Sequence, residues 1–181
     1  MNIFFGDDNY LFFLRKMRVH ILNHSKILAY CLMPNHFHFL LYTSSNSEPG
    51  GLNSGIAVLL RSYTRAINNQ HTMSGSIFQQ KKKAKCLNKT KLSTGFEDVK
   101  ATYNYARICF NYIHQNPVRA GIAKRMEDWR YSSFLDYSGY RKGTLCDIEF
   151  TRKLLGIPEG EPFYSFSNEE IIKVDLEEIL E

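Results

Sequence analysis

Hydrophobic and polar positions repeat with helical spacing near the start of the chain. Leu11, Leu14, Met17 and Ile21 lie three or four residues apart, so their side chains share one face of a helix. Two aspartates precede this pattern, and aspartate is a favoured N-cap residue. The pattern therefore predicts a helix over residues 7–23.

The next apolar positions follow a strand pattern. Two short runs, KILAYCLM (26–33) and HFHFLLY (36–42), are separated only by a turn that contains Pro34. Proline cannot donate a hydrogen bond to a sheet, and it biases Met33 towards extended backbone. The sequence therefore predicts an antiparallel β-hairpin.

Helical periods and turn residues mark the remaining elements. Helices are expected at residues 52–71, at about 96–116 with Pro117 just past the end, at 147–157 and at 167–181. Residues 72–86 pass from a turn into a short strand or ribbon, and residues 126–143 form an irregular aromatic segment. Helices together with an antiparallel sheet indicate the α+β class, with the sheet flanked by helices.

Charge is distributed unevenly along the 181 residues. Residues 159–181 carry eight acidic side chains and one basic one, whereas the preceding 158 residues carry ten acidic and 22 basic side chains. A basic body is typical of a surface that binds a polyanion. The acidic tail is interpreted first as a solvated end, and second as a segment that covers the basic surface.

The cysteines and the apolar runs exclude two classes of protein. The four cysteines are scattered without the paired spacing of a zinc site. No apolar run reaches membrane-spanning length, and no signal peptide is recognised. We expect reduced thiols, a cytoplasmic protein and no membrane role.

Two histidines interrupt the second strand. Alternate residues of a strand point to the same face, so His36 and His38 project together and Phe37 and Phe39 project to the other face. Two imidazoles on one face can chelate a divalent cation if a third ligand comes from elsewhere. The alternative is a pair of ordinary histidines satisfied by hydrogen bonds.

A second polar group lies near the end of the helix expected at 96–116. Tyr112 and Asn116 are four residues apart and share a face, with Gln115 beside them, whereas His114 points elsewhere. Tyr112 can present a phenol while Asn116 or Gln115 offers an amide oxygen to a metal. The alternative is a helix that simply ends in polar residues.

Four segments carry a family resemblance. "MPNHFHFLLY", "YIHQNPVRAGI" and "EDWRYSS" occur in this order, with "SYTRAINNQHTMSGSIFQQKKKAK" between the first two. Together they resemble the single-tyrosine transposases of the HUH superfamily, most closely the REP-associated tyrosine transposases. The resemblance covers residues from about 3 to 137. We therefore divide the chain into a transposase-like domain (1–142) and a C-terminal helical, acidic extension (143–181).

The resemblance implies a fold and a chemistry. The family fold is a ferredoxin-like antiparallel sheet with helices packed on it. In that family the residues at His36, His38 and Asn116 hold Mg²⁺ or Mn²⁺, with Gln115 as a second choice here for the amide ligand. Tyr112 corresponds to the nucleophile, which attacks single-stranded or hairpin DNA and forms a 5′-phosphotyrosine.

Basic residues are the candidates for contact with the DNA backbone. Phosphate contacts position a strand without reading its sequence. The candidates are Arg61, Arg65, Lys81, Lys82, Lys83, Lys85 and Arg119. Trp129, Tyr131 and Phe134 either stack on bases or, as we favour, pack in the core.

One departure from the family pattern affects these expectations. Family members begin with a further strand of the form Tyr-His-Val-Thr-x-Arg, and this sequence has no such segment before Ile3. A sheet without that strand has an exposed edge, which favours a homodimer over a monomer. An alternative function is then a truncated or domesticated relative that binds DNA without cleaving it. A metal phosphohydrolase that acts on small phosphoesters is a third hypothesis.

Overall fold

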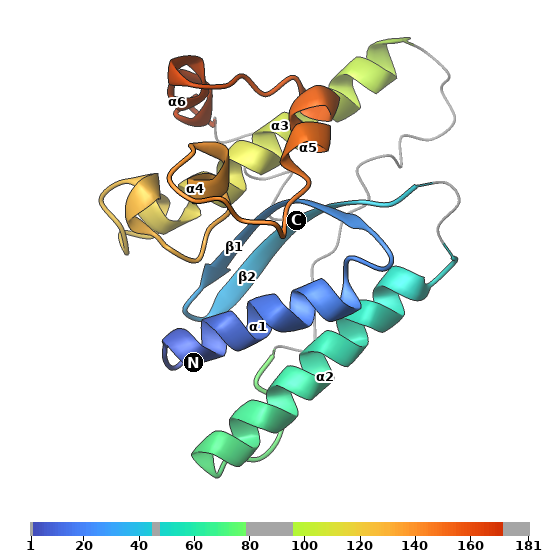
Figure 1. Cartoon of the computed structure of the whole chain (residues 1–181), viewed down its shortest axis with the longest axis vertical. Coiled ribbons are helices and arrows are strands. Elements are labelled where there is room, and N and C mark those ends of the chain that lie inside the picture. The colour runs from blue at the N-terminus through green and yellow to red at the C-terminus, as the bar shows by residue number, and fades with distance from the viewer. Residues whose placement is uncertain (1, 45–47, 79–95, 172–181) are drawn as a thin grey trace.

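The fold combines one β-hairpin with helices on both of its faces. The computed structural model describes residues 2–44, 48–78 and 96–171 (Figure 1). Side chains are described for all of these residues except 96–103. Its elements are α1 (Asp7–His20), β1 (Lys26–Met33), β2 (His36–Tyr42), α2 (Gly51–His71), α3 (Phe96–Arg119), the 3₁₀ helix η1 (Met126–Asp128), α4 (Phe134–Tyr137), α5 (Ile148–Leu155) and α6 (Glu161–Ser167). The predicted α+β class is confirmed.

The hairpin has the predicted bounds and is antiparallel. Tyr30 pairs with Phe39, and Cys31 pairs with His38. Helices α1 and α2 lie together on one side of the hairpin, and α3 crosses its other side (Figure 1). The two strands with these helices are compatible with a ferredoxin-like arrangement.

Helix α3 continues further than expected. It passes through Pro117 and ends at Arg119, so the prediction that the helix stops before this proline is wrong. Proline removes one helical hydrogen bond. The loss is tolerated because Pro117 is in the last turn, where the Ala120 amide still donates to the Asn116 carbonyl at 2.9 Å. Asn116 consequently keeps its helical position after Tyr112.

The C-terminal part differs from the sequence prediction in two places. A helix occupies Glu161–Ser167, where none was expected, and residues 168–171 are not helical although a helix was predicted over 167–181. Helix α6 begins with Glu161 and a proline in its first turn, which suits a helix N-terminus. The rest of the predicted acidic helix lies outside the described residues.

The two edges of the hairpin are in different environments. Segment 131–133 covers the outer edge of β1: the Leu32 amide donates to the Tyr131 carbonyl, and the Ser133 amide donates to the Tyr30 carbonyl, each at 3.0 Å. Along β2, no described segment other than β1 forms backbone hydrogen bonds. Within the described residues, the expected open edge is therefore that of β2.

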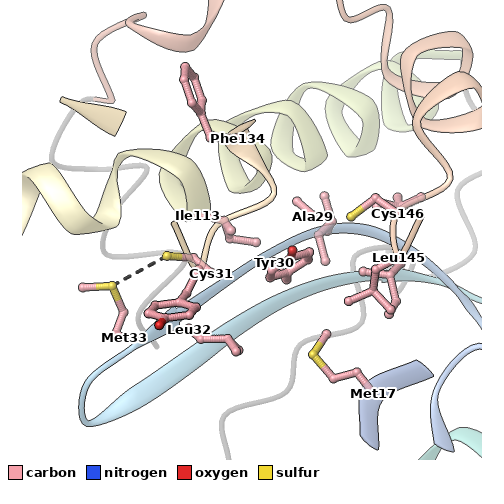
Figure 2. Close-up of a cluster of buried hydrophobic side chains, with 14 of the residues drawn as sticks. Met17, Ala29, Tyr30, Cys31, Leu32, Met33, Ile113, Phe134, Leu145 and Cys146 are labelled. Atoms are coloured by element: carbon pink, nitrogen blue, oxygen red, sulfur yellow. Dashed lines mark hydrogen bonds between the residues drawn. The ribbon is translucent and has the colours of Figure 1, made fainter. Parts of the chain in front are cut away.

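One hydrophobic cluster joins the N-terminal and C-terminal parts. Met17 of α1, Leu32 of β1 and Ile113 of α3 belong to the same buried cluster as Leu145 and Cys146, which precede α5 (Figure 2). The cluster extends to residues of α6. The division at residue 142 stays a sequence interpretation, and side chains on both sides of it share one core. No described helix is long and apolar enough to cross a membrane.

Candidate functional site

The two histidines of β2 face α3, as the alternation of a strand requires. On the opposite face of β2, Phe37 and Phe39 pack on Phe13 of α1. Their ring centroids lie 5.3 and 6.2 Å, respectively, from the Phe13 centroid. These aromatic contacts bury one face of the strand in the core. They therefore fix the other face, with His36 and His38, towards α3.

The imidazoles and the tyrosine form a compact cluster. The ring centroids of His36 and His38 are 4.8 Å apart, and those of His38 and Tyr112 are 5.5 Å apart. Tyr112 is 9% exposed and Asn116 is 7% exposed. The structure thus brings together four residues that the sequence singled out: His36, His38, Tyr112 and Asn116.

Burial favours the neutral form of both imidazoles. Burial lowers the pKa of His38 to about 4, and the nearby His36 lowers it further, while the Asn116 side chain partly opposes the shift. Burial also lowers the pKa of His36, again opposed by Asn116. Neutral imidazole carries the free lone pair that a metal ligand needs. A cation could therefore bind these imidazoles without displacing a proton from them.

One atom of the cluster lacks a partner. His38 Nε2 is buried and makes no hydrogen bond in the described structure, which costs on the order of 1–3 kcal/mol for a buried polar atom. A cation beside this nitrogen would remove that cost. This orphaned atom is the observation that makes a metal fit here.

Among the described residues, the side chain available as a third ligand is an amide. No group of three His, Cys, Asp or Glu side chains that could hold a metal is found among the described residues. Asn116, whose side-chain nitrogen lies 3.5 Å from the Tyr112 carbonyl, is the polar group shared by both imidazoles. Two imidazoles and one amide oxygen suit Mn²⁺ better than Mg²⁺, which prefers oxygen ligands.

Gln115, the second-choice ligand, is directed to another part of the molecule. Its side-chain amide donates to the Ser167 carbonyl at 2.8 Å and to the Glu169 carbonyl at 2.9 Å. These bonds satisfy carbonyls at the end of α6. In this structure Gln115 attaches α6 to α3 and does not join the histidine cluster.

The basic candidates are divided between two faces. Arg61 and Arg65 line a groove of about 780 Å³ along α2, together with Asn68 and Asn69. Because α2 packs on α1, this groove and the histidine cluster are on opposite sides of the hairpin. Arg119 is exposed in the last turn of α3. The four lysines between 81 and 85 lie outside the described residues.

The aromatic residues after η1 pack in the interior. Tyr131 is 5% exposed and stacks on Tyr10 with centroids 3.7 Å apart, and Phe134 is fully buried. The Trp129 indole donates to the Leu32 carbonyl at 3.0 Å. These contacts agree with the favoured interpretation that the three side chains serve the core.

Sequence reasoning missed one residue near the site. Ser133 lies in the segment predicted to be irregular, yet it is fully buried and hydrogen bonds to both β1 and α3. The available signal was the paired serines that follow an aromatic residue in "RYSS". The helical or strand periodicity of the sequence does not indicate that Ser133 is buried or that it forms these hydrogen bonds.

Acid should destabilise the protein through its buried histidines. Burial lowers the pKa of His114 to about 3 and that of His38 to about 4, from 6.5 in the unfolded chain. The unfolded chain therefore binds more protons below pH 6.5, and stability is complete above that pH and lost as the pH falls. Each histidine contributes a slope of about 1.4 kcal/mol per pH unit. Urea unfolding at pH 7.0, 6.0 and 5.0 measures this slope.

The variant His38→Gln provides the matched comparison for this effect. It removes one histidine whose pKa is strongly lowered, so below pH 6.5 the dependence of its unfolding free energy on pH should be shallower by about 1.4 kcal/mol per pH unit. An unchanged slope in the variant would contradict the assigned burial of His38.

The fold and the cluster define a class of site: an α+β scaffold that places two neutral imidazoles of a strand beside a tyrosine and an amide of a helix. Comparison with known proteins adds a distant relative. The chain is 26% identical over 107 residues to a Haemophilus influenzae protein described as "Putative REP-associated tyrosine transposase". The match spans 59% of this chain and 57% of that protein's length.

This distant similarity supports a relationship to transposases only weakly. No family model matches the chain. No solved structure matches it either.

Proposed function

We propose that this protein is a metal-dependent tyrosine transposase that cleaves and rejoins single-stranded or hairpin DNA. The observation that carries the proposal is the contact between the Tyr112 ring and the His38 ring, with Asn116 one helical turn away. A nucleophile, two imidazoles and an amide meet at one place, although they come from segments far apart in the chain. The distant transposase relative supports the same assignment.

Tyr112 is the nucleophile in this proposal. Its phenolic oxygen forms a bond to the phosphorus of a DNA phosphodiester while the bond from phosphorus to the 3′-oxygen breaks. The phenol loses its proton, and the departing 3′-oxygen takes one up. One phosphate ester replaces another, so a 3′-hydroxyl can reverse the step and rejoin the strands without ATP.

His36, His38 and Asn116 would hold the cation. A bound divalent cation supplies Lewis-acid polarisation of the phosphate and charge neutralisation. The residues themselves contribute neutral ligands, which leave the positive charge of the site undiminished. The contact of the Tyr112 ring with His38 supports a position for the phenol beside the cation.

Substrate binding is assigned to the basic side chains. Arg61 and Arg65 offer paired charge along the α2 groove, and Arg119 lies three residues after Asn116 at the end of α3. The lysines at 81, 82, 83 and 85 stay predictions for the same role. Such contacts should make DNA affinity fall steeply with salt concentration.

End-labelled DNA distinguishes this reaction from simple binding. The full chain is incubated with Mn²⁺ and a single-stranded hairpin substrate labelled at either its 3′ or its 5′ end. A 5′-phosphotyrosine retains the 3′-labelled fragment on the protein in a denaturing gel and releases the 5′-labelled fragment with a free 3′-hydroxyl. EDTA should prevent both results.

Three other outcomes would contradict the proposal. Retention of the 5′ label would reverse the polarity of the linkage. Salt-sensitive DNA binding with no adduct under any metal would indicate a relative that binds DNA without cleaving it. Hydrolysis of small phosphoesters without DNA affinity would indicate a phosphohydrolase.

A further inference from the structure

A buried hydrogen bond attaches α3, the helix that carries Tyr112, to Ser133. His114 of α3 is fully buried, and its Nε2 is 2.7 Å from the Ser133 hydroxyl oxygen. The ring is enclosed by aromatic side chains, with centroids 4.3 Å from Phe110, 5.7 Å from Tyr137 and 5.8 Å from Phe134. A polar bond in such surroundings is costly to break, so it constrains the helix strongly.

Ser133 is in turn attached to β1 at Tyr30. The Tyr30 amide donates to the Ser133 hydroxyl oxygen at 2.9 Å, the hydroxyl donates to the Tyr30 carbonyl at 3.1 Å, and the Ser133 amide donates to the same carbonyl at 3.0 Å. When the hydroxyl donates to the Tyr30 carbonyl, His114 donates to the hydroxyl oxygen from its Nε2, and in the other tautomer the hydroxyl donates to Nε2. Ser133 therefore cannot move along β1 without losing several bonds.

The connection continues to the histidine cluster. Tyr30 pairs with Phe39 in the hairpin, and the next pair joins Cys31 to His38. His114 is thus attached through Ser133 to the part of the sheet that presents His38. Three other side chains of α3, those of Arg107, Asn111 and Gln115, donate to carbonyls of residues 155–169, and these bonds attach C-terminal segments to the helix.

Helix geometry explains how this attachment fixes the direction in which Tyr112 points. Residues two apart on a helix are separated by about 200° around its axis. His114 therefore points to the flank of α3 opposite Tyr112 and Asn116. That flank is attached to the outer edge of β1 through Ser133, while Tyr112 faces β2. A bond at that position restricts both rotation and sliding of α3.

We infer that His114 is a positioning residue, whose hydrogen bond to Ser133 sets the rotation and register of α3 so that Tyr112 and Asn116 face His38. Its effect on the reaction rests on the proposed function. The placement itself is a property of the folded chain and can be measured without any activity.

Nuclear Overhauser effects between the ring protons of Tyr112 and His38 measure the placement, since their centroids are 5.5 Å apart. We expect this effect in the wild type and in His114→Gln, whose amide can donate to Ser133. We expect it to weaken or vanish in His114→Leu. Tyr63→Phe is the matched control, because it removes another buried hydroxyl bond, to the Ile3 carbonyl, on the opposite side of the hairpin.

Adduct formation with hairpin DNA and Mn²⁺ gives the second readout. At saturating DNA, His114→Leu should react about 10- to 100-fold more slowly, because small displacements of a reacting group reduce rates by such factors. DNA affinity should not change, and His114→Gln should recover most of the rate. Tyr63→Phe should react like the wild type.

The two readouts separate the possible failures. A folded His114→Leu with wild-type ring contacts would overturn the inference, whatever its activity. A wild type without any adduct would overturn the proposed function, while the ring contacts would still decide the role of His114. If His114→Leu does not fold, Ser133→Ala removes the same bond from the other side and must show the same loss of contact.

Discussion

Replacing Tyr112 with phenylalanine is expected to abolish the covalent protein–DNA adduct, with a loss of at least about 1000-fold. The substitution removes only the nucleophilic oxygen. The ring stays 9% exposed and packed on His38, so the fold and the histidine cluster should be preserved. Denaturing gels with 3′-labelled hairpin DNA and Mn²⁺ measure the adduct, and filter binding measures DNA affinity, which should not change.

Tyr140→Phe is the control for this variant. Tyr140 is 63% exposed, so it is the tyrosine that would react if accessibility alone decided the nucleophile. We expect Tyr140→Phe to form the adduct at the wild-type rate. An adduct that persists in Tyr112→Phe would contradict the assignment and would require another nucleophile, which peptide mapping of the adduct would identify.

Replacing His38 with alanine should weaken metal binding and slow cleavage. The variant deletes the buried Nε2 that has no other partner, and it leaves only His36 and Asn116 as ligands. Loss of one of three ligands should weaken Mn²⁺ binding by more than 10-fold, and adduct formation should fall by at least about 100-fold. Titration calorimetry with Mn²⁺ alone measures the first effect independently of DNA.

His71→Ala is the matched control for His38→Ala. His71 is an exposed histidine at the end of α2, with its ring tilted against Phe5 at a centroid distance of 4.5 Å, and its removal should leave Mn²⁺ binding unchanged. Undiminished Mn²⁺ binding by His38→Ala would exclude His38 as a ligand. If that variant also lost the adduct, His38 would instead act on the DNA or on Tyr112.

Local patterns were sufficient for the elements that lie close in the chain. The hairpin, α1 and α2 could be predicted because their apolar side chains follow a clear strand or helix period, and Pro34 marks the turn between the strands. The end of α3 was mispredicted because proline usually ends a helix, and the sequence pattern does not show that Pro117 lies within the last turn. Helix α6 was missed because its buried aromatic residues are held by distant contacts: Phe166 packs on α3 and Phe163 packs on α4.

The candidate site could be only partly predicted from the residues. Alternation placed His36 and His38 on one face, and helical spacing placed Tyr112 with Asn116. Nothing local indicates that these two faces meet, because that depends on how α3 is rotated against the hairpin. The family resemblance supplied this expectation, and the contacts of Gln115 and Ser133 required the three-dimensional structure.

The covering of β1 has a consequence for the order in which the chain can fold. The two strands of the hairpin are close in the sequence and can pair early. The outer edge of β1, however, is hydrogen-bonded to Ser133, which lies 103 residues after Tyr30. During synthesis the hairpin therefore emerges from the ribosome long before the segment that seals it, and closing such a distant contact is slow. The nascent N-terminal half spends that interval with an unprotected strand edge, so chaperone capture should concentrate there.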